Sequence, residues 1–450
     1  MWTFFRKNME AFRQIPFVRD VFTLQLGSGL YFTATFLSSI AFARLLGVEE
    51  YGTYAVILAF AGTASNLLNL GQSSSLLVFF AEEYGKKSKS GMATVLKNFA
   101  QVAATNGVVL IMLALAAPKI SDLLYGDPRV GMLARVLFLF QAIDVWNSML
   151  LIILQAIRRI RLKVLLEQAA NLTFLCTAVT VLFFGAGIRG IFASQLCISL
   201  LFLIISYCTY RIVGRKENLP SLHHLRSIPT SATIPYFTQG ILFSVEKNIG
   251  NLFPQGIFFL LSTVAPASAI GLARIAVQFA NLPRQFLLAP VGDLSTTVLA
   301  NQKAQGMGVI RRNAAKIVKH TLAMFTAMNI GIGIVLPVAV PLLYGREFAP
   351  VTYTAWWLLL FSTFGALAVV NSPLLRLFRM VHYSIAQALV SWTLVLIVIF
   401  TLKDTLVPLT IFIIAYGTGQ ILPLTITYVL FSRKLVYAPT SDTAKIQTPK

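Results

Sequence analysis

The sequence predicts an all-α integral membrane protein whose twelve transmembrane helices form two six-helix lobes. Three observations lead to this prediction. Hydrophobic residues make up 57% of the 450 residues and charged residues only 12%, about half the charged share that soluble domains carry. Apolar stretches that could cross a bilayer, which takes about 20 residues in a helix, recur from residue 21 to residue 432. One nine-residue pattern occurs once in each half of the chain.

The expected spans are the apolar runs between polar breaks. They lie near residues 21–44, 53–80, 98–117, 132–157, 168–187, 190–210, 236–263, 267–300, 317–341, 352–377, 385–402 and 408–432. The second and eighth exceed the length of a straight crossing, so we expect a tilt or a kink in each. Cys176, Cys197 and Cys208 lie inside spans, where we interpret them as small buried apolar residues.

Basic residues indicate the topology of the chain, because lysine and arginine are retained on the cytoplasmic side. Most of the 37 basic residues lie in the N-terminal segment, in every second loop and in the C-terminal tail. The opposite loops hold only Lys119, Arg129, Arg189, Arg346 and Lys403. Both termini are therefore predicted to be cytoplasmic. The net charge of +21 then reflects topology and a match to anionic membrane lipids, and it does not indicate nucleic acid.

An internal repeat supports the two lobes. The pattern Pro-x4-Leu-Leu-Tyr-Gly begins at Pro118 and again at Pro337, 219 residues later, and the same shift places Gly52 on Gly271. Because six spans is an even number, both copies enter the membrane from the same side and form parallel repeats. Such repeats are typical of transporters that rock two lobes around a central cavity. We divide the chain into a basic N-terminal segment (1–20), an N-lobe (21–219), a C-lobe (220–432) and a tail (433–450).

We interpret the repeated pattern as an outward-facing turn between helices. The proline would end a span, the leucines would re-enter the interface, the tyrosine would anchor at headgroup level, and the glycine would permit the reversal. In the N-terminal segment, Phe5, Met9 and Phe12 share a helical face. This segment is either an interfacial amphipathic helix or a basic tail.

The stretch FARLLGVEEYGTYAV, which begins at Phe42, resembles a turn of the polysaccharide-transporter family. This family comprises the lipid-linked oligosaccharide flippases of the multidrug/oligosaccharidyl-lipid/polysaccharide exporter (MOP) superfamily. Arg44-Leu45-Leu46-Gly47 and Tyr51-Gly52-x-Tyr54 carry the likeness, and the two LLYG turns are similar to those of the family. The resemblance implies a MATE-like fold with a cavity lined mainly by spans one, two, seven and eight.

The resemblance also implies a cargo and a place. The cargo would be a polyprenyl-pyrophosphate-linked oligosaccharide, moved from the inner to the outer leaflet of a bacterial or archaeal cytoplasmic membrane for surface polysaccharide, such as O-antigen, by alternating access. Partners would be membrane lipids and the polymerase and assembly proteins of the pathway. No metal cluster, cofactor motif or phosphate-binding loop is present in the sequence.

Polar residues inside the expected cavity spans are candidates for cargo binding, because charge inside a bilayer is costly and tends to serve function. Arg274, Gln278, Asn281 and Gln285 recur at i, i+4, i+7 and i+11 of span eight, beside Arg284, and therefore share one helical face. Span seven carries Lys247, Asn251 and Gln255 at i, i+4 and i+8, with Pro254 breaking its backbone ladder. Arg44, Gln25 and Asn66 of spans one and two complete the set.

The balance of these side chains is cationic, and arginine and lysine are suited to a pyrophosphate, while amides can follow sugar hydroxyls. Lys247 falls on Ser28 of the first repeat and Arg274 on Ala55, so only the second lobe carries these charges. Asp144, Glu246 and Asp293 are candidates for a coupling proton or ion.

Structural roles remain open at several of these positions. Arg284 and Arg135 could snorkel to the membrane surface, and Arg44 could be an anchor. Asp144 could neutralise a cavity arginine, bind a coupling ion or cap a local network, and we favour a structural pair.

Three alternatives to a lipid-linked oligosaccharide flippase are considered. A drug or cation antiporter of the same superfamily would be expected to bury carboxylates, whereas the candidate cavity is richer in Lys and Arg. A membrane glycan polymerase or glycosyltransferase would need a sizeable loop or domain for catalysis, and the longest loop, near 211–235, is basic and inward. A non-transporting scaffold would not need polar stripes. We therefore expect a transporter and not an enzyme.

Overall fold

A computed structural model describes residues 16–68, 72–221, 228–229, 233–234, 236–237, 252–288, 291, 295, 299, 307–377 and 381–437. All regular elements in these ranges are helices, which confirms the predicted fold class. The chain divides into two compact units, Met1–Phe259 and Leu260–Lys450. The boundary between the two lobes that we predicted from the repeat, between residues 219 and 220, lies earlier in the chain than this boundary between the units. Lys247, Asn251, Glu246 and Asp293 and the N-terminal face of Phe5, Met9 and Phe12 fall outside the described residues.

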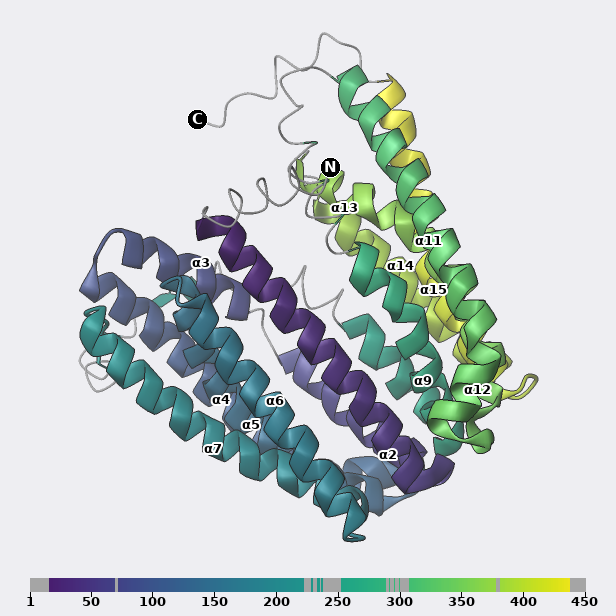
Figure 1. Cartoon of the computed structure of the whole chain (residues 1–450), viewed down its shortest axis with the longest axis horizontal. Helices are drawn as coiled ribbons and strands as arrows, with labels where there is room; N and C mark the ends of the chain where they lie inside the picture. The colour runs from purple at the N-terminus through teal and green to yellow at the C-terminus, as the bar shows by residue number, and fades with distance from the viewer. Residues whose placement is uncertain are drawn as a thin grey trace, which may run out of the picture. The chain divides into compact units, whose positions relative to one another are not determined.

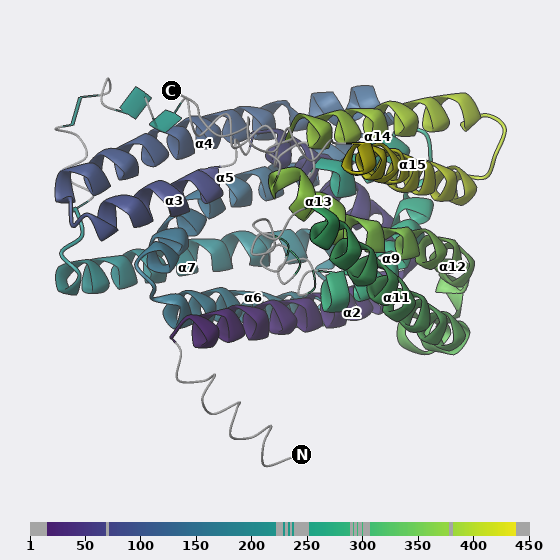
Figure 2. The same ribbon diagram turned by 90° about the horizontal axis from the view of Figure 1, so that it is seen from above.

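The first unit is built from long helices that pack side by side (Figures 1 and 2). They are α2 (Pro16–Leu68), α3 (Gln72–Gly85), α4 (Lys89–Tyr125), α5 (Pro128–Ala156), α6 (Ile160–Phe183) and α7 (Gly187–Lys216). Helix α5 contacts all the others, and its apolar core with α3 and α4 includes Phe80, Leu96 and Ile153. A further helix follows at Leu252–Ser262.

The second unit begins with the last residues of helix Leu252–Ser262, which α9 follows (Figures 1 and 2). Its elements are α9 (Ala267–Pro283), η3 (Arg284–Leu288), α11 (Met307–Tyr344), η5 (Arg346–Phe348), α12 (Pro350–Thr363), η6 (Phe364–Leu367), α13 (Ala368–Leu377), α14 (Val381–Leu402) and α15 (Pro408–Tyr437). Helix α12 packs on α9, and α14 packs on α15. In the described part of the whole chain, nine helices are long and apolar enough to cross a membrane.

Helix α2 shows why fewer helices than expected spans are found. It contains the first expected span and most of the second, joined at Gly47, whose φ of 73° and ψ of 176° are not helical. Only glycine adopts a positive φ of this kind without strain. The rest of the second expected span lies in α3, which begins at Gln72, and residues 69–71 fall outside the described residues.

Helix 252–262 shows why the unit boundary falls at Phe259. The ring of Phe259 stacks on Phe60 of α2 with centroids 6.2 Å apart. The side chain of Gln255 lies against Gly62, where a Cβ atom would approach it to 3.5 Å. Two residues of the predicted seventh span, Gln255 and Phe259, thus pack on α2 within the first unit.

The repeated pattern has matching surroundings in both units. The ring centroids of Phe60 and Tyr125 lie 6.2 Å apart edge to face, and those of Phe279 and Tyr344, at the same shift of 219 residues, lie 6.0 Å apart in the same arrangement. Outside each pair, Leu123 is 87% exposed and Leu342 is 67% exposed. The repeat is therefore present in the packing as well as in the sequence.

The interpretation of that pattern needs two corrections. Pro118 and Pro337 do not end their helices, because α4 and α11 continue past them to Tyr125 and Tyr344. The tyrosines contact the phenylalanines and are not free anchors: Tyr344 is only 2% exposed, and Tyr125 is half-buried. The glycine expectation is confirmed, since Gly126 has a φ of 65° and caps α4.

Each of these prolines leaves a carbonyl without its helical donor, four residues earlier. In α4 this is the oxygen of Ala114, which accepts a hydrogen bond from Nε of Arg135 at 3.1 Å. In α11 it is the oxygen of Gly333, which accepts from Nε1 of Trp356 at 2.8 Å. A side chain from the following helix thus replaces the missing donor in both units. Arg135 has a structural role of this kind, in place of the snorkelling that we considered.

The cysteines were also misinterpreted. Cys176, Cys197 and Cys208 are exposed on the surface of the first unit. Their spans are apolar on several sides, so hydropathy did not distinguish a core-facing position from a lipid-facing one.

Candidate functional site

The polar residues of α9 lie along one edge of a helix that is otherwise buried. The apolar residues between them, from Ala269 to Ala273 and from Ile275 to Val277, are buried. Arg274, Gln278 and Asn281 are half-buried. Because these three share a helical face, they form the open edge of α9. We call Arg274, Gln278 and Asn281 the α9 polar edge.

The α9 polar edge continues into an irregular turn. Pro283 lacks an N–H and cannot pair with the carbonyl of Phe279, and the chain changes to a π-helical turn from Arg284 to Leu288. Arg284 and Gln285 are exposed on this turn. Such turns are rare and frequently lie at functional sites. The sequence predicted the polar face but not the change of helix type at its end.

The remaining candidates that the structure describes belong to the first unit. Gln25 and Arg44 are exposed on α2, and Asn66 is half-buried near its end. Gln255 packs on α2 at Gly62. Pro254 lies in the first described turn of its helix, and the residue whose carbonyl it would leave unpaired is outside the described ranges.

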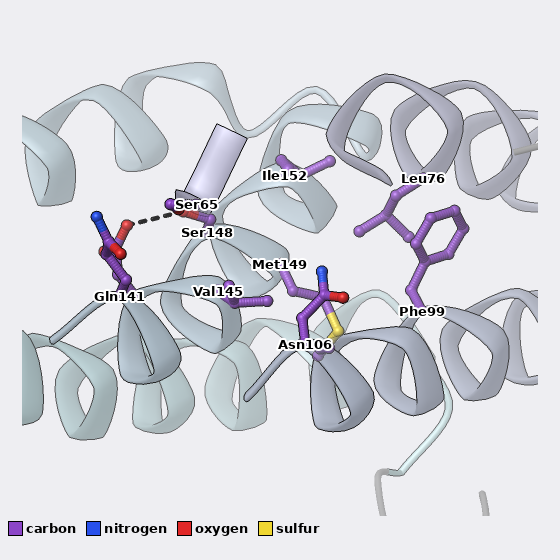
Figure 3. Close-up of a pocket in the computed structure, with 11 residues that line it drawn as sticks. Ser65, Leu76, Phe99, Asn106, Gln141, Val145, Ser148, Met149 and Ile152 are labelled. Atoms are coloured by element: carbon purple, nitrogen blue, oxygen red, sulfur yellow. Dashed lines mark hydrogen bonds between the residues drawn. The ribbon is translucent and has the colours of Figure 1, made fainter. Parts of the chain in front are cut away.

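A small polar pocket lies inside the first unit (Figure 3). It has a volume of about 120 Å³, and its polar lining consists of Ser65, Asn106, Gln141, Asp144 and Ser148. Figure 3 shows Gln141, Val145, Ser148 and Met149 along one helix, with Asn106 approaching from another. We call this space the Asp144 pocket.

The lining side chains of the Asp144 pocket are held by hydrogen bonds. The hydroxyl of Ser148 donates to Oδ2 of Asp144 at 3.5 Å. Nε2 of Gln141 donates to the carbonyl of Ala61 at 3.3 Å, and Nδ2 of Asn106 donates to the carbonyl of Leu68 at 3.0 Å. Two carbonyls of α2 thereby fix the amides that face the pocket.

Asp144 forms no ion pair with any Lys, Arg or His in the part of the chain that the structure describes. The structural pair that we favoured is thus absent from that part. Oε1 of Gln141, which lines the same pocket, is buried and has no hydrogen-bond partner among the described residues. Buried oxygens are rarely left this way. A carboxylate that shares a pocket with such an oxygen can take up a proton or a small cation.

Sequence reasoning identified Asp144 but missed the residues around it. Gln141, Asp144 and Ser148 occur at i, i+3 and i+7 of α5, a spacing that places them on one face. This spacing is visible in the sequence. The contribution of Asn106 cannot be predicted from the sequence, because this residue belongs to α4 and reaches the pocket only through the packing of α4 on α5.

The chain matches one known protein family in sequence. The family model described as "Polysaccharide biosynthesis protein" matches residues 17–294. No curated protein matches the chain in sequence.

Solved structures match over nearly the whole chain. An inward-facing multidrug resistance MATE family transporter of the MOP superfamily has a TM-score of 0.67 at 13% identity, covering 93% of this chain and 96% of its own. The lipid II flippase MurJ in an inward closed conformation has a TM-score of 0.68 at 15% identity, covering 94% and 89%. A MOP superfamily transporter from Pyrococcus furiosus Vc1 has a TM-score of 0.58 at 12% identity, covering 94% and 97%. At these identities the matches show a shared fold.

Proposed function

Because the chain belongs to the polysaccharide biosynthesis protein family, we propose that it is a flippase for polyprenyl-pyrophosphate-linked oligosaccharides. It moves these repeat units from the inner to the outer leaflet of a bacterial or archaeal cytoplasmic membrane by alternating access. Membership of the family supports a polysaccharide precursor as the cargo. The fold shared with MurJ and MATE transporters supports a transport mechanism. The chain itself performs transport and no glycan chemistry.

The α9 polar edge is the observation that carries this proposal. An arginine and two amides are half-buried on a helix most of whose other residues are buried. Arg274 binds a pyrophosphate oxygen by charge-assisted hydrogen bonds, and Gln278 and Asn281 bind sugar hydroxyls. We further propose that the cargo contacts the other candidates that the sequence predicts: Arg284, Gln285, Lys247, Asn251, Gln255, Arg44, Gln25 and Asn66.

The sign of the charge separates this function from cation export. A cationic drug would be repelled by Arg274 and Arg284, whereas a pyrophosphate would be attracted. The Pyrococcus furiosus transporter is itself described as having a binding pocket of reversed polarity that suggests a different function.

The Asp144 pocket provides a route for energy coupling. A carboxylate with no basic partner among the described residues changes charge when it binds a proton or Na⁺, and a transporter with two conformations responds to such a change when they bind the ion unequally. We propose Asp144 as the coupling residue, with Glu246 and Asp293 as further candidates.

Proteoliposomes that contain a labelled polyprenyl-pyrophosphate oligosaccharide test the function. The purified full chain should bring inner-leaflet label to the outer leaflet much faster than protein-free vesicles do, as measured by accessibility to an impermeant enzyme or quencher. A parallel assay measures uptake of a cationic dye. Equal exchange with and without protein would refute the flippase, and uptake of the dye without glycan exchange would assign a cation exporter.

A further inference from the structure

A second pocket lies in the first unit at the end of α7, on residues that the cargo proposal does not use. Its volume is about 800 Å³. Tyr207, Arg211 and Arg215 line it from α7, Lys89 from the start of α4, and Asn218 from the turn after α7. The three α7 residues recur at i, i+4 and i+8 and therefore lie one above the other on the helix. We call this space the α7 basic pocket.

The chain builds this pocket with an ordered helix end. Asn218 adopts a left-handed conformation with φ of 54°, and the N–H of Leu219 donates to the carbonyl of Gly214 at 2.9 Å. This is the hydrogen bond that closes a Schellman-type helix end. The hydroxyl of Tyr210 then donates to the carbonyl of Pro220 at 2.6 Å. These bonds return the chain onto α7 and form a wall of the pocket.

The charges of the α7 basic pocket are not neutralised within the described part of the chain. Lys89 donates to Oδ1 of Asn218 at 3.1 Å, which leaves two further ammonium hydrogens. No carboxylate of the described residues pairs with Lys89, Arg211 or Arg215. Glu217 is engaged elsewhere, by the hydroxyl of Tyr84 at 2.8 Å and by the guanidinium of Arg159. The pocket therefore favours an anion.

The face of α7 that leads into the pocket changes character along its length. Leu200 and Ile204 are exposed apolar residues, Tyr207 follows, and Arg211 and Arg215 end the series. They lie at i, i+4, i+7, i+11 and i+15, on one stripe of a helix that is long and apolar enough to cross a membrane. Apolar, aromatic and basic groups in this order match the acyl chains, the interfacial region and the headgroup of a lipid.

We propose that the α7 basic pocket binds the phosphate of an anionic phospholipid in the leaflet that faces the basic loops. The planar guanidinium groups of Arg211 and Arg215 donate paired hydrogen bonds to the phosphate oxygens, and Lys89 adds a third positive group. Tyr207 lies against the ester region, and the acyl chains lie on Ile204 and Leu200. Free phosphate and a prenyl pyrophosphate carry the same kind of oxygens. The apolar stripe favours a lipid. The residues that line the pocket are not among those that the cargo proposal uses, which favours a bulk phospholipid over the cargo.

Lipid retention by the purified full chain tests this proposal. The protein is reconstituted in vesicles of phosphatidylcholine with a minor fraction of phosphatidylglycerol, extracted gently, and its bound lipids are counted by native mass spectrometry. We expect the double variant Arg211→Gln, Arg215→Gln to retain at least about 5-fold less phosphatidylglycerol than the native chain, with phosphatidylcholine unchanged. The matched control is Arg311→Gln, Arg312→Gln, which removes two exposed arginines of α11 and should leave retention unchanged. Size-exclusion profiles verify that each variant is folded.

Competition identifies the source of the phosphate. Phosphatidylglycerol in excess should displace a labelled phosphatidylglycerol, while inorganic phosphate and a short-chain prenyl pyrophosphate should not. Displacement by inorganic phosphate would overturn the lipid assignment in favour of a soluble anion, and displacement by the prenyl pyrophosphate alone would reassign the pocket to cargo. Equal losses in both double variants would also overturn the proposal, because the effect would then follow total charge. None of these measurements depends on transport.

Discussion

Arg274 occupies a position where the two halves of the chain differ. Its counterpart in the first repeat, Ala55, is completely buried, whereas Arg274 is half-buried on the open edge of α9. An alanine needs no polar partner in a packed unit, but a guanidinium does. The same backbone position therefore serves packing in the first unit and presents a charge in the second. The residues that we assign to cargo are among those at which the repeat is broken.

Asp144 yields a prediction about energy coupling. Asp144→Asn preserves the size of the side chain but cannot change charge, so transport should lose its dependence on a proton or Na⁺ gradient while exchange without a gradient continues. Rates in proteoliposomes with imposed gradients measure this. Asp122→Asn, which removes an exposed acid of the same unit, is the control. An unchanged gradient dependence in Asp144→Asn would exclude this residue from coupling.

Glu217 yields a prediction about pH. Hydrogen bonds from Arg159 and from the Tyr84 hydroxyl hold the pKa of Glu217 below its usual value. A lowered pKa stabilises the fold above the unfolded pKa of about 4.3, and this contribution is lost as the pH falls through the lower folded value. Glu217→Gln should therefore reduce thermal stability in detergent at pH 7, by no more than about 1 kcal/mol for so exposed a pair.

As the pH falls below about 4.3, the unfolded pKa, the difference in unfolding temperature between the native chain and Glu217→Gln should shrink. Glu347→Gln, an exposed acid of the second unit, is the control and should have little effect at pH 7 or at pH 3. A stability difference of Glu217→Gln that persists in full at pH 3 would show that the variant acts by another mechanism.

At the scale of the helix, the paired prolines are the feature that sequence and structure explain together. Pro118 and Pro337 mark the repeat in the sequence, and the repeat predicted two corresponding helices. Their effect on the helix could not be predicted, because it depends on Arg135 and Trp356 in the next helix. Those residues are of different types and do not align as a motif. The proline alone predicts a break; the supplied donor lets the helix continue.

Trp356 provides the test of this helix device. Trp356→Phe keeps an aromatic ring but leaves the carbonyl of Gly333 without its donor, which should cost about 1–3 kcal/mol. Trp357→Phe, on the adjacent exposed residue, should cost less. In the background of Pro337→Ala, which restores a backbone N–H four residues after Gly333, the cost of Trp356→Phe should shrink. Thermal unfolding of the native chain, Trp356→Phe, Pro337→Ala and the double variant forms a double-mutant cycle. A cost of Trp356→Phe that is independent of Pro337 would contradict the account.

At the scale of the whole chain, hydropathy and the repeat were sufficient to predict a helical membrane protein, and the structural matches confirm that fold class. The candidate site was only partly predictable. The α9 polar edge was predictable, because the helical spacing of its residues can be read from a single sequence. The surroundings of Asp144 and the walls of the α7 basic pocket are built from separate helices and a left-handed residue, Asn218, and require tertiary structure.

Topology is the next prediction at this scale. The distribution of basic residues places Arg129 outside and Arg161 inside, with both termini cytoplasmic. In a chain whose three cysteines are replaced, an impermeant maleimide added to intact cells should label Arg129→Cys but not Arg161→Cys; both should react after permeabilisation. Both side chains are exposed, so access to solvent is matched. The opposite labelling pattern would reverse the proposed direction of transport.

The most direct test of the central claim compares two arginine variants in the flippase assay. Arg274→Ala should slow leaflet exchange of the polyprenyl-pyrophosphate oligosaccharide by about 10-fold or more, since a hydrogen bond to a charged group contributes about 1.5–3 kcal/mol. Arg346→Ala, which removes an exposed arginine after α11, should exchange the lipid at the native rate. Full activity in Arg274→Ala would contradict the assignment of the α9 polar edge to cargo.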